Sequence, residues 1–149
     1  MEIQTRQFGP IEIDEGRVVH LTEPMPGFTG LRRFAVLDPD ADSPLKWLQS
    51  VEQADVCFLV VDPRAFFPDY EVQLPPARLA DLCLDDPSGA VVAVVLTVGE
   101  DLSKTTANLL APILFNPRQG LARQVILEGS DYPVRAPLFE EPQRACQGL

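Results

Sequence analysis

Short apolar runs separated by turn-forming residues extend along most of the chain, and this spacing is typical of β proteins. Ala90–Val98 is the strongest strand signal, because five of its nine residues are valine. Cys57–Val61 is continuously apolar, as expected for a strand buried on both faces. The other predicted strands before the last third of the chain are Ile11–Asp14, Val18–Leu21, Arg33–Leu37, Leu45–Glu52 and Glu71–Leu74.

The last third predicts a β-hairpin, and the middle predicts a short helix. Leu109–Phe115 and Leu121–Leu127 flank the turn Asn116–Gly120, whose length and glycine suit a hairpin. Pro75 and Pro76 stand where a helix can begin, and Leu79, Leu82 and Cys83 follow at helical spacing. Pro112 has no amide hydrogen, so we expect its strand to lie at an edge or to carry a bulge.

The chain's length and proline content favour one fold class. The 149 residues fit one domain, and 15 prolines argue for many short elements rather than a helical bundle. We therefore predict a mainly β, single-domain, closed or partly closed, antiparallel-rich β-barrel or pseudo-barrel with one short helix. The domain is expected to cover residues 1–139, and residues 140–149 to form a flexible tail.

The charge is unevenly distributed. Of the net charge of −10, residues 38–101 carry all of it, with thirteen acidic and three basic side chains. Such a surface repels phosphate backbones, which argues against direct nucleic-acid binding. It also accelerates encounters with a basic partner, although solubility alone would explain it. The longest apolar stretch is too short to cross a bilayer, and no signal peptide is visible, so we predict a cytoplasmic protein without membrane contact.

Residues suited to catalysis are scarce. His20 is the single histidine, and it is interpreted as structural. The cysteines Cys57, Cys83 and Cys146 lack metal-ligand spacing and are interpreted as free thiols. No nucleotide-binding or nucleophile motif occurs. We therefore predict no catalytic residue, no metal and no cofactor. The alternatives are a small-ligand-binding β-barrel protein or a carboxylate-dependent hydrolase with a closed acidic pocket, and a structural subunit of an assembly.

Two segments are candidates for protein binding. Phe66, Phe67, Asp69, Tyr70 and Glu71 place aromatic rings among charges, as interface hot spots do, although the rings would also serve as core. The run 105–108 contains Thr105, Thr106 and Asn108, whose side chains are suited to a partner's backbone. A local turn is the favoured interpretation of that second run.

These stretches together resemble the FliW family of flagellar assembly factors. The most specific run is Glu100–Ile113, and the resemblance extends over residues 3–139, nearly the whole chain. The other matching motifs are Pro26–Gly27–Phe28, Leu48–Gln49–Ser50–Val51–Glu52, Asp62–Pro63, Phe66–Glu71, Asn116, Gly120, Arg123–Leu127, Tyr132, Arg135, Pro137 and Leu138.

The resemblance implies a role that composition does not reveal. FliW proteins are non-enzymatic and bind CsrA, an RNA-binding dimer that represses flagellin translation, and they also bind flagellin. Flagellin that accumulates in the cytoplasm occupies FliW, so CsrA is released and translation falls. The resemblance therefore implies a translational regulator and assembly factor that relieves repression by CsrA. For flagellin, we expect an apolar or edge-strand contact near Pro112.

Overall fold

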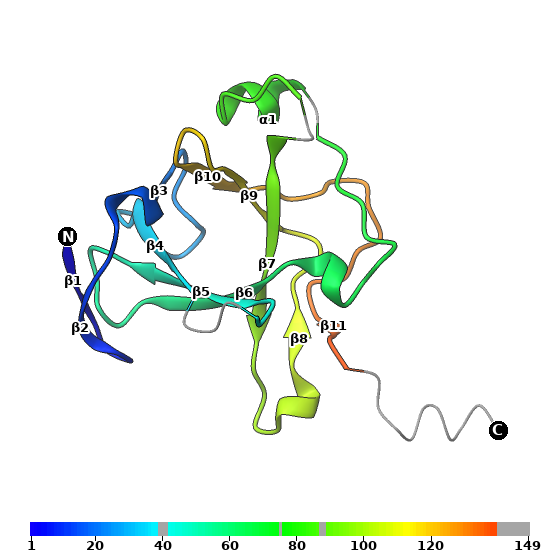
Figure 1. Ribbon diagram of the computed structural model, residues 1–149. Helices are drawn as coiled ribbons and strands as arrows, with labels where there is room; N and C mark the ends of the chain where they lie inside the picture. Colours follow the sequence, from blue (N-terminus) through cyan, green and yellow to red (C-terminus); the bar gives the residue numbers. More distant parts are fainter. Residues whose placement is uncertain (39–41, 75, 87–88, 140–149) are drawn as a thin grey trace.

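A closed barrel of seven strands forms the centre of the computed structural model, which describes residues 1–38, 42–74, 76–86 and 89–139. The ring closes because β7 pairs with both β6 and β9. All neighbours in the ring are antiparallel except β3 and β10, which are parallel. Figure 1 shows this ring, and it confirms the predicted fold class. The barrel strands are β3 (Val18–Leu21), β4 (Arg33–Leu37), β5 (Leu45–Ser50), β6 (Cys57–Val61), β7 (Val91–Thr97), β9 (Ile113–Asn116) and β10 (Leu121–Gln124).

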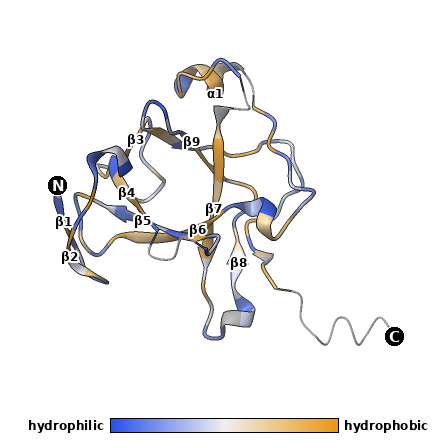
Figure 2. Cartoon of the chain, viewed as in Figure 1, coloured by the Kyte–Doolittle hydropathy of each residue, from blue (hydrophilic) through white to orange (hydrophobic). Residues whose placement is uncertain are grey.

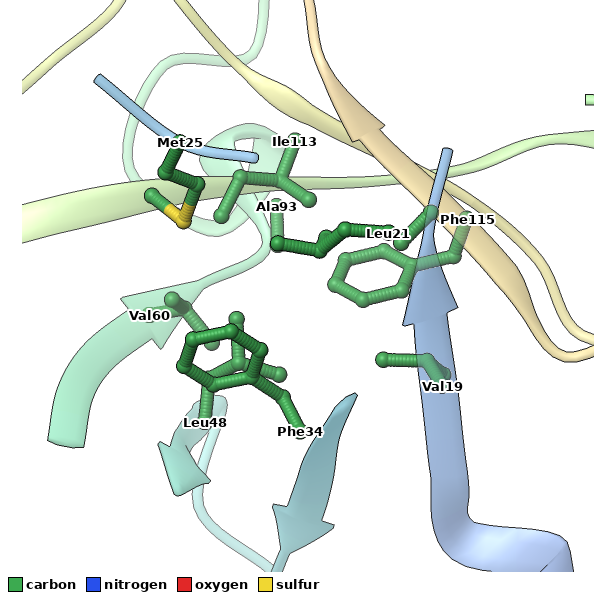
Figure 3. Close-up of a cluster of buried hydrophobic side chains, with 10 residues drawn as sticks. Val19, Leu21, Met25, Phe34, Leu48, Val60, Ala93, Ile113 and Phe115 are labelled. Atoms are coloured by element: carbon green, nitrogen blue, oxygen red, sulfur yellow. The ribbon is translucent and has the colours of Figure 1, made fainter. Parts of the chain in front are cut away.

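Apolar side chains from all seven strands meet inside the barrel. Phe34 and Leu48 are fully buried, and Phe34 lies against Phe58, with 6.0 Å between their ring centres. The ring of Phe28 meets Phe58 edge-on at 5.1 Å. Figure 3 shows the inward-pointing side chains of this cluster, and Figure 2 shows the hydrophobic course of β7 beside it. The cluster consists of Val19, Leu21, Met25, Phe34, Leu48, Val60, Ala93, Ile113, Phe115 and Ala122.

A separate two-stranded sheet lies beside β5. It consists of β1 (Glu2–Thr5) and β2 (Gly9–Glu12), which pair antiparallel, and the 3-10 turn η1 (Glu15–Arg17) follows it. Phe8, between the two strands, contacts the ring of Trp47 edge-on with centres 6.1 Å apart. Strand β1 was not predicted, because its apolar positions are few and are mixed with polar residues.

Two very short strands extend the sheet beyond the barrel. β8 (Thr106–Ala107) pairs with the end of β7, and β11 (Ala136–Pro137) pairs with β8. They lie over a second apolar cluster, which includes Val61, Val94, Leu96, Ala107 and Leu109. The turn η2 (Pro63–Ala65) follows β6, and η4 (Leu102–Lys104) lies between β7 and β8. This second cluster supports the surface described below.

The predicted helix is present as α1 (Pro76–Asp81), and a single amide fixes the chain that follows it. Asn116 is buried, and its Nδ2 donates to the carbonyl oxygens of Leu82 and Cys83 at 2.7 and 3.3 Å. Its Oδ1 accepts from the Arg118 amide at 3.2 Å. Asn116 therefore holds both the residues after α1 and the β9–β10 turn.

The structure confirms most of the predicted strands and contradicts one. The strands at 18–21, 33–37 and 57–61 have the expected bounds, and the hairpin is β9 and β10. The predicted strand Glu71–Leu74 is wrong, because it pairs with no strand among the described residues. The Glu71 amide instead donates to the Tyr132 hydroxyl at 3.0 Å. The predicted tail, residues 140–149, lies outside the described residues.

Candidate protein-binding surface

The two candidate segments, far apart in sequence, meet at one corner of the molecule. Tyr70 is buried, and its hydroxyl donates to the carbonyl oxygen of Leu109 at 2.6 Å. This hydrogen bond ties segment 66–71 to Leu109, the residue that follows the run 105–108. The buried ring of Tyr70 therefore positions the surface from beneath, and a partner would reach its neighbours first.

Four aromatic rings make up this corner, which we call the aromatic corner: Phe66, Tyr70, Tyr132 and Phe139. Tyr70 lies against Tyr132 with ring centres 4.6 Å apart, and Phe66 meets Phe139 edge-on at 5.9 Å. Phe66 is half-buried, whereas Phe139 is 44% exposed. Exposed aromatic area supported by packed rings is typical of binding surfaces.

The remaining predicted residues divide between surface and support. Phe67 is half-buried against the second apolar cluster, whereas Asp69 and Glu71 are exposed. Thr105 is buried, and its carbonyl oxygen accepts from the Leu138 amide at 3.0 Å. Thr106 is half-buried in β8.

Asn108 confirms the turn interpretation for its own side chain. Its Oδ1 accepts from the Ala111 amide at 3.1 Å, which turns the chain locally. The neighbouring Thr106 and Ala107 instead form strand β8, which was not expected. Local hydrogen bonding therefore accounts for the conformation at Asn108, and strand pairing accounts for that of Thr106 and Ala107.

Carboxylates border the aromatic corner. Asp62 caps η2, and its side chain accepts from the Arg64 amide at 3.0 Å. Asp69 and Glu71 are exposed, and their side chains have no hydrogen bond or ion pair among the described residues. Asp101 lies outside segment 66–71, on the β7–β8 connection, where the amide and hydroxyl of Ser103 lower its pKa. Asp101 therefore stays ionised at neutral pH.

Sequence reasoning missed two residues of the corner as binding candidates, namely Tyr132 and Phe139. Tyr132 is an isolated aromatic residue in a polar loop, and such a residue has no strand pattern to mark it. Phe139 stands at the predicted domain end, where an apolar residue is easily taken for the start of a tail. Only the folded chain shows that both contact segment 66–71.

Two features, a cluster of metal-ligating side chains and a membrane-spanning helix, are absent from the described residues. No group of three or more His, Cys, Asp or Glu side chains in this part of the chain is placed to hold a metal ion. The single histidine, His20, is exposed on β3. No helix within the described ranges combines the length and apolarity needed to span a membrane.

The two described cysteines are expected to differ in reactivity. Both Cys57 and Cys83 are free thiols, and burial raises the pKa of Cys57 to about 11. At pH 8 only roughly one in a thousand Cys57 thiols would be ionised, and the thiolate is the reactive form. In a Cys146→Ser background, we expect a disulfide reagent to modify exposed Cys83 at least about tenfold faster than Cys57. Colorimetric thiol titration of the Cys57→Ser and Cys83→Ser derivatives measures both rates, and equal rates would contradict this burial.

Comparison with known proteins places the whole chain in one group. Residues 2–138 match the family model described as FliW protein. The flagellar assembly factor FliW of Moorella thermoacetica is 38% identical over 142 residues, covering 95% of this chain and 90% of that protein. The Thermoanaerobacter pseudethanolicus protein of the same name is 34% identical over 146 residues, covering 97% of both. A crystal structure of a flagellar assembly factor FliW superimposes with a TM-score of 0.88 at 34% identity, covering 95% of this chain and 99% of that one.

Proposed function

The chain belongs to the FliW family of flagellar assembly factors, and we propose that it acts by binding flagellin and the RNA-binding regulator CsrA in the cytoplasm. In this proposal, CsrA held by the protein does not repress flagellin translation. Accumulating flagellin displaces CsrA, which then binds the message again. The protein has no catalytic step in this cycle.

The observation that carries this proposal is the acidic border of the aromatic corner. Asp69 and Glu71 present exposed carboxylates in the same segment as Phe66, whose ring contacts the exposed ring of Phe139. A protein that grips RNA displays positive charge, so this border attracts it and repels the RNA. The aromatic rings supply contact area once the two proteins meet. We propose that Phe66, Phe67, Asp69, Tyr70, Glu71, Thr105, Thr106 and Asn108 form or support the contact.

Charge reversal at this border should weaken CsrA binding. We expect the double variant Asp69→Lys/Glu71→Lys to slow association with purified CsrA about tenfold or more at low salt, because electrostatic steering is reversed. Raising the salt concentration should slow the unmodified protein and narrow the difference. Surface plasmon resonance at several salt concentrations measures both effects.

The control for this experiment makes the same charge change elsewhere. Glu2→Lys/Glu12→Lys alters a cross-strand pair on the β1–β2 sheet, away from the corner in Figure 1. This control should bind CsrA nearly as the unmodified protein does. Equal loss in both double variants would show that net charge alone matters, and full binding by Asp69→Lys/Glu71→Lys would show that the border is not the contact.

Competition tests the two-partner cycle itself. Purified flagellin is added to a preformed complex of this protein with CsrA, and a pull-down through CsrA reports what remains bound. Increasing flagellin should release the protein from CsrA. Stable retention of all three proteins in one complex would contradict displacement.

The alternative, a hydrolase with an acidic pocket, has less support. A general acid in such a site needs a carboxyl group whose pKa is raised. The pKa values of Glu52 and Asp101 are lowered, chiefly by backbone amides: those of Arg33 and Arg32 for Glu52, and that of Ser103 for Asp101. Lowered pKa values favour permanently charged, structural or binding carboxylates.

A further inference from the structure

An open cleft lies beside β10, on the side away from β9. Its volume is about 720 Å³, within the range of ligand sites. One wall is formed by Gln124, the last residue of β10, and by the residues after it, including Ile126, and the opposite wall includes Pro24 and Pro26. In Figure 1 the continuation of β10 runs to the right, toward the segment that follows η2.

The wall formed by Gln124 and the residues after β10 presents unpaired backbone amides as far as Ile126, where the Glu128 amide donates to the Ile126 carbonyl oxygen at 3.0 Å and the chain begins to turn. The amides of Val125 and Leu127 donate to the carbonyl oxygens of Pro112 and Leu110, at 2.9 and 2.8 Å. Because hydrogen-bonding sides alternate along a strand, the amides of Gln124 and Ile126 face the cleft. Among the described residues, β3 pairs with β10 only at Leu121 and Ala122, and the Thr22 amide adds one bond to the Ala122 carbonyl.

Strand β3 ends before it can cover this edge. Pro24 and Pro26 follow it and have no amide hydrogens with which to continue a ladder. The guanidinium of Arg32 donates to the Leu21 and Thr22 carbonyl oxygens at 3.4 and 3.1 Å, and so terminates β3. The space that a longer β3 would fill beside β10 therefore belongs to the cleft.

The cations of the cleft are already neutralised, whereas some of its carboxylates are free. Arg123 is only 17% exposed and pairs with Glu23 at 2.6 Å and with Asp81 at 2.8 Å. Arg78 pairs with the same Asp81 at 2.9 Å. The side chains of the other two acidic lining residues, Glu71 and Glu128, have no hydrogen bond or ion pair among the described residues.

Buried and exposed side chains alternate along the wall up to the turn that begins at Glu128. Val125 and Leu127 are buried, whereas Ile126 is 58% exposed and Glu128 is exposed. A second strand laid along this edge would place one side chain against Ile126 and another, two residues away, near Glu128. The complementary side chains are apolar and basic, respectively.

We propose that this cleft is a β-augmentation site that takes an extended segment of a partner protein in which a basic residue stands two positions from an apolar one. Main-chain hydrogen bonds to Gln124 and Ile126 hold the segment, and Glu71 and Glu128 select its charge. The inference rests on the proposed function and adds a binding mode to it. The backbone edge lies beside the residues that pair with Pro112 and not at Pro112 itself, which is buried.

The test uses the full-length protein and a capped hexapeptide, the lysine–valine peptide, in which lysine and valine stand two residues apart with threonine between them, so that both lie on one face of an extended strand. Nuclear magnetic resonance of the labelled protein should show the amides of Gln124 and Ile126 shifted, with hydrogen exchange slowed by about tenfold or more at saturation. A glutamate–valine peptide should bind far more weakly, as should a lysine–valine peptide with methylated backbone nitrogens. Equal binding by the methylated peptide, or shifts confined to another face, would overturn the proposal.

Variants of the protein give an independent readout. Ile126→Pro removes the amide hydrogen that faces the cleft and should abolish peptide binding, whereas Ile126→Val keeps it and should bind. If Ile126→Pro does not fold, Glu71→Gln/Glu128→Gln preserves the backbone and should weaken binding of the lysine–valine peptide severalfold at low salt. Unchanged binding there would overturn the proposed charge selection. This experiment uses neither flagellin nor CsrA, so a negative peptide result does not contradict the proposed function. A negative pull-down likewise does not contradict binding of the peptide.

Discussion

Phe34→Ala is expected to lower the free energy of unfolding by about 3–5 kcal/mol, the range for truncating a large core aromatic residue. Phe34 is fully buried at the middle of the barrel, beside Leu48 and against the ring of Phe58. A closed barrel of seven strands cannot contract to fill the space of a missing phenyl group without losing strand pairing. Most of the cavity left by Phe34→Ala should therefore persist. Urea denaturation followed by circular dichroism measures the change.

The matched control is Phe8→Ala, which removes the same side chain from an exposed position. Phe8 is 40% exposed and meets the ring of Trp47 outside the barrel. Its loss should cost less than about 1.5 kcal/mol, as an aromatic contact of this kind does. If the two variants were destabilised equally, the barrel interior would not be the main source of stability.

The barrel could be predicted from sequence because its strands are short, apolar and bounded by turn residues. Val18–Leu21, Arg33–Leu37 and Cys57–Val61 have the expected bounds, since each run pairs along its whole length. The parallel pairing of β3 with β10 joins residues about a hundred positions apart, and closure of the ring also requires β7 to pair with β9, so the sequence pattern specifies neither contact.

Strand β5 shows why local pattern is ambiguous. Leu45, Trp47 and Val51 suggest an apolar face, yet the residue that enters the barrel core is Leu48, while Trp47 contacts Phe8 outside it. Both faces of β5 are covered, one by the core and the other in part by the β1–β2 sheet. A strand covered on both sides has no clean alternation of apolar and polar residues.

The candidate surface was predictable in part. Segment 66–71 is marked by its aromatic and acidic composition, and the structure joins it to Leu109, directly after the run 105–108. Burial of Tyr70 and Thr105 could not be anticipated, because their polar groups find partners only after folding. Tyr132 and Phe139 join through tertiary contacts alone.

Gln49→Glu is the second substitution with a large expected effect, because Gln49 is a fully buried polar residue beside the core. Its Nε2 donates to the carbonyl oxygens of Ser50, Ala54 and Val56, at 3.1, 3.1 and 3.2 Å. This amide holds the turn from β5 to β6 closed. Replacing it with a carboxylate directs negative charge at three carbonyl oxygens in a site without water access.

We expect Gln49→Glu to lower the free energy of unfolding by about 3–5 kcal/mol at neutral pH, as an uncompensated buried charge does. Gln49→Leu keeps the volume and adds no charge, so it should cost only about 1–2 kcal/mol for the lost hydrogen bonds. The smaller cost is reasonable because the Ala54 and Val56 carbonyl oxygens also accept from the amides of Arg6 and Ser50.

The pH dependence of stability distinguishes the cost of the buried charge in Gln49→Glu from the cost of altered packing in Gln49→Leu. Burial disfavours the ionised form of a carboxyl group, so the folded Gln49→Glu variant holds its proton to a higher pH than the unfolded chain does. Its deficit relative to the unmodified protein should therefore be smaller at about pH 5 than at pH 7 and should grow as pH rises. The deficit of Gln49→Leu should stay constant over the same range. Urea denaturation at several pH values measures both deficits, and a Gln49→Glu deficit independent of pH would mean that water reaches this site.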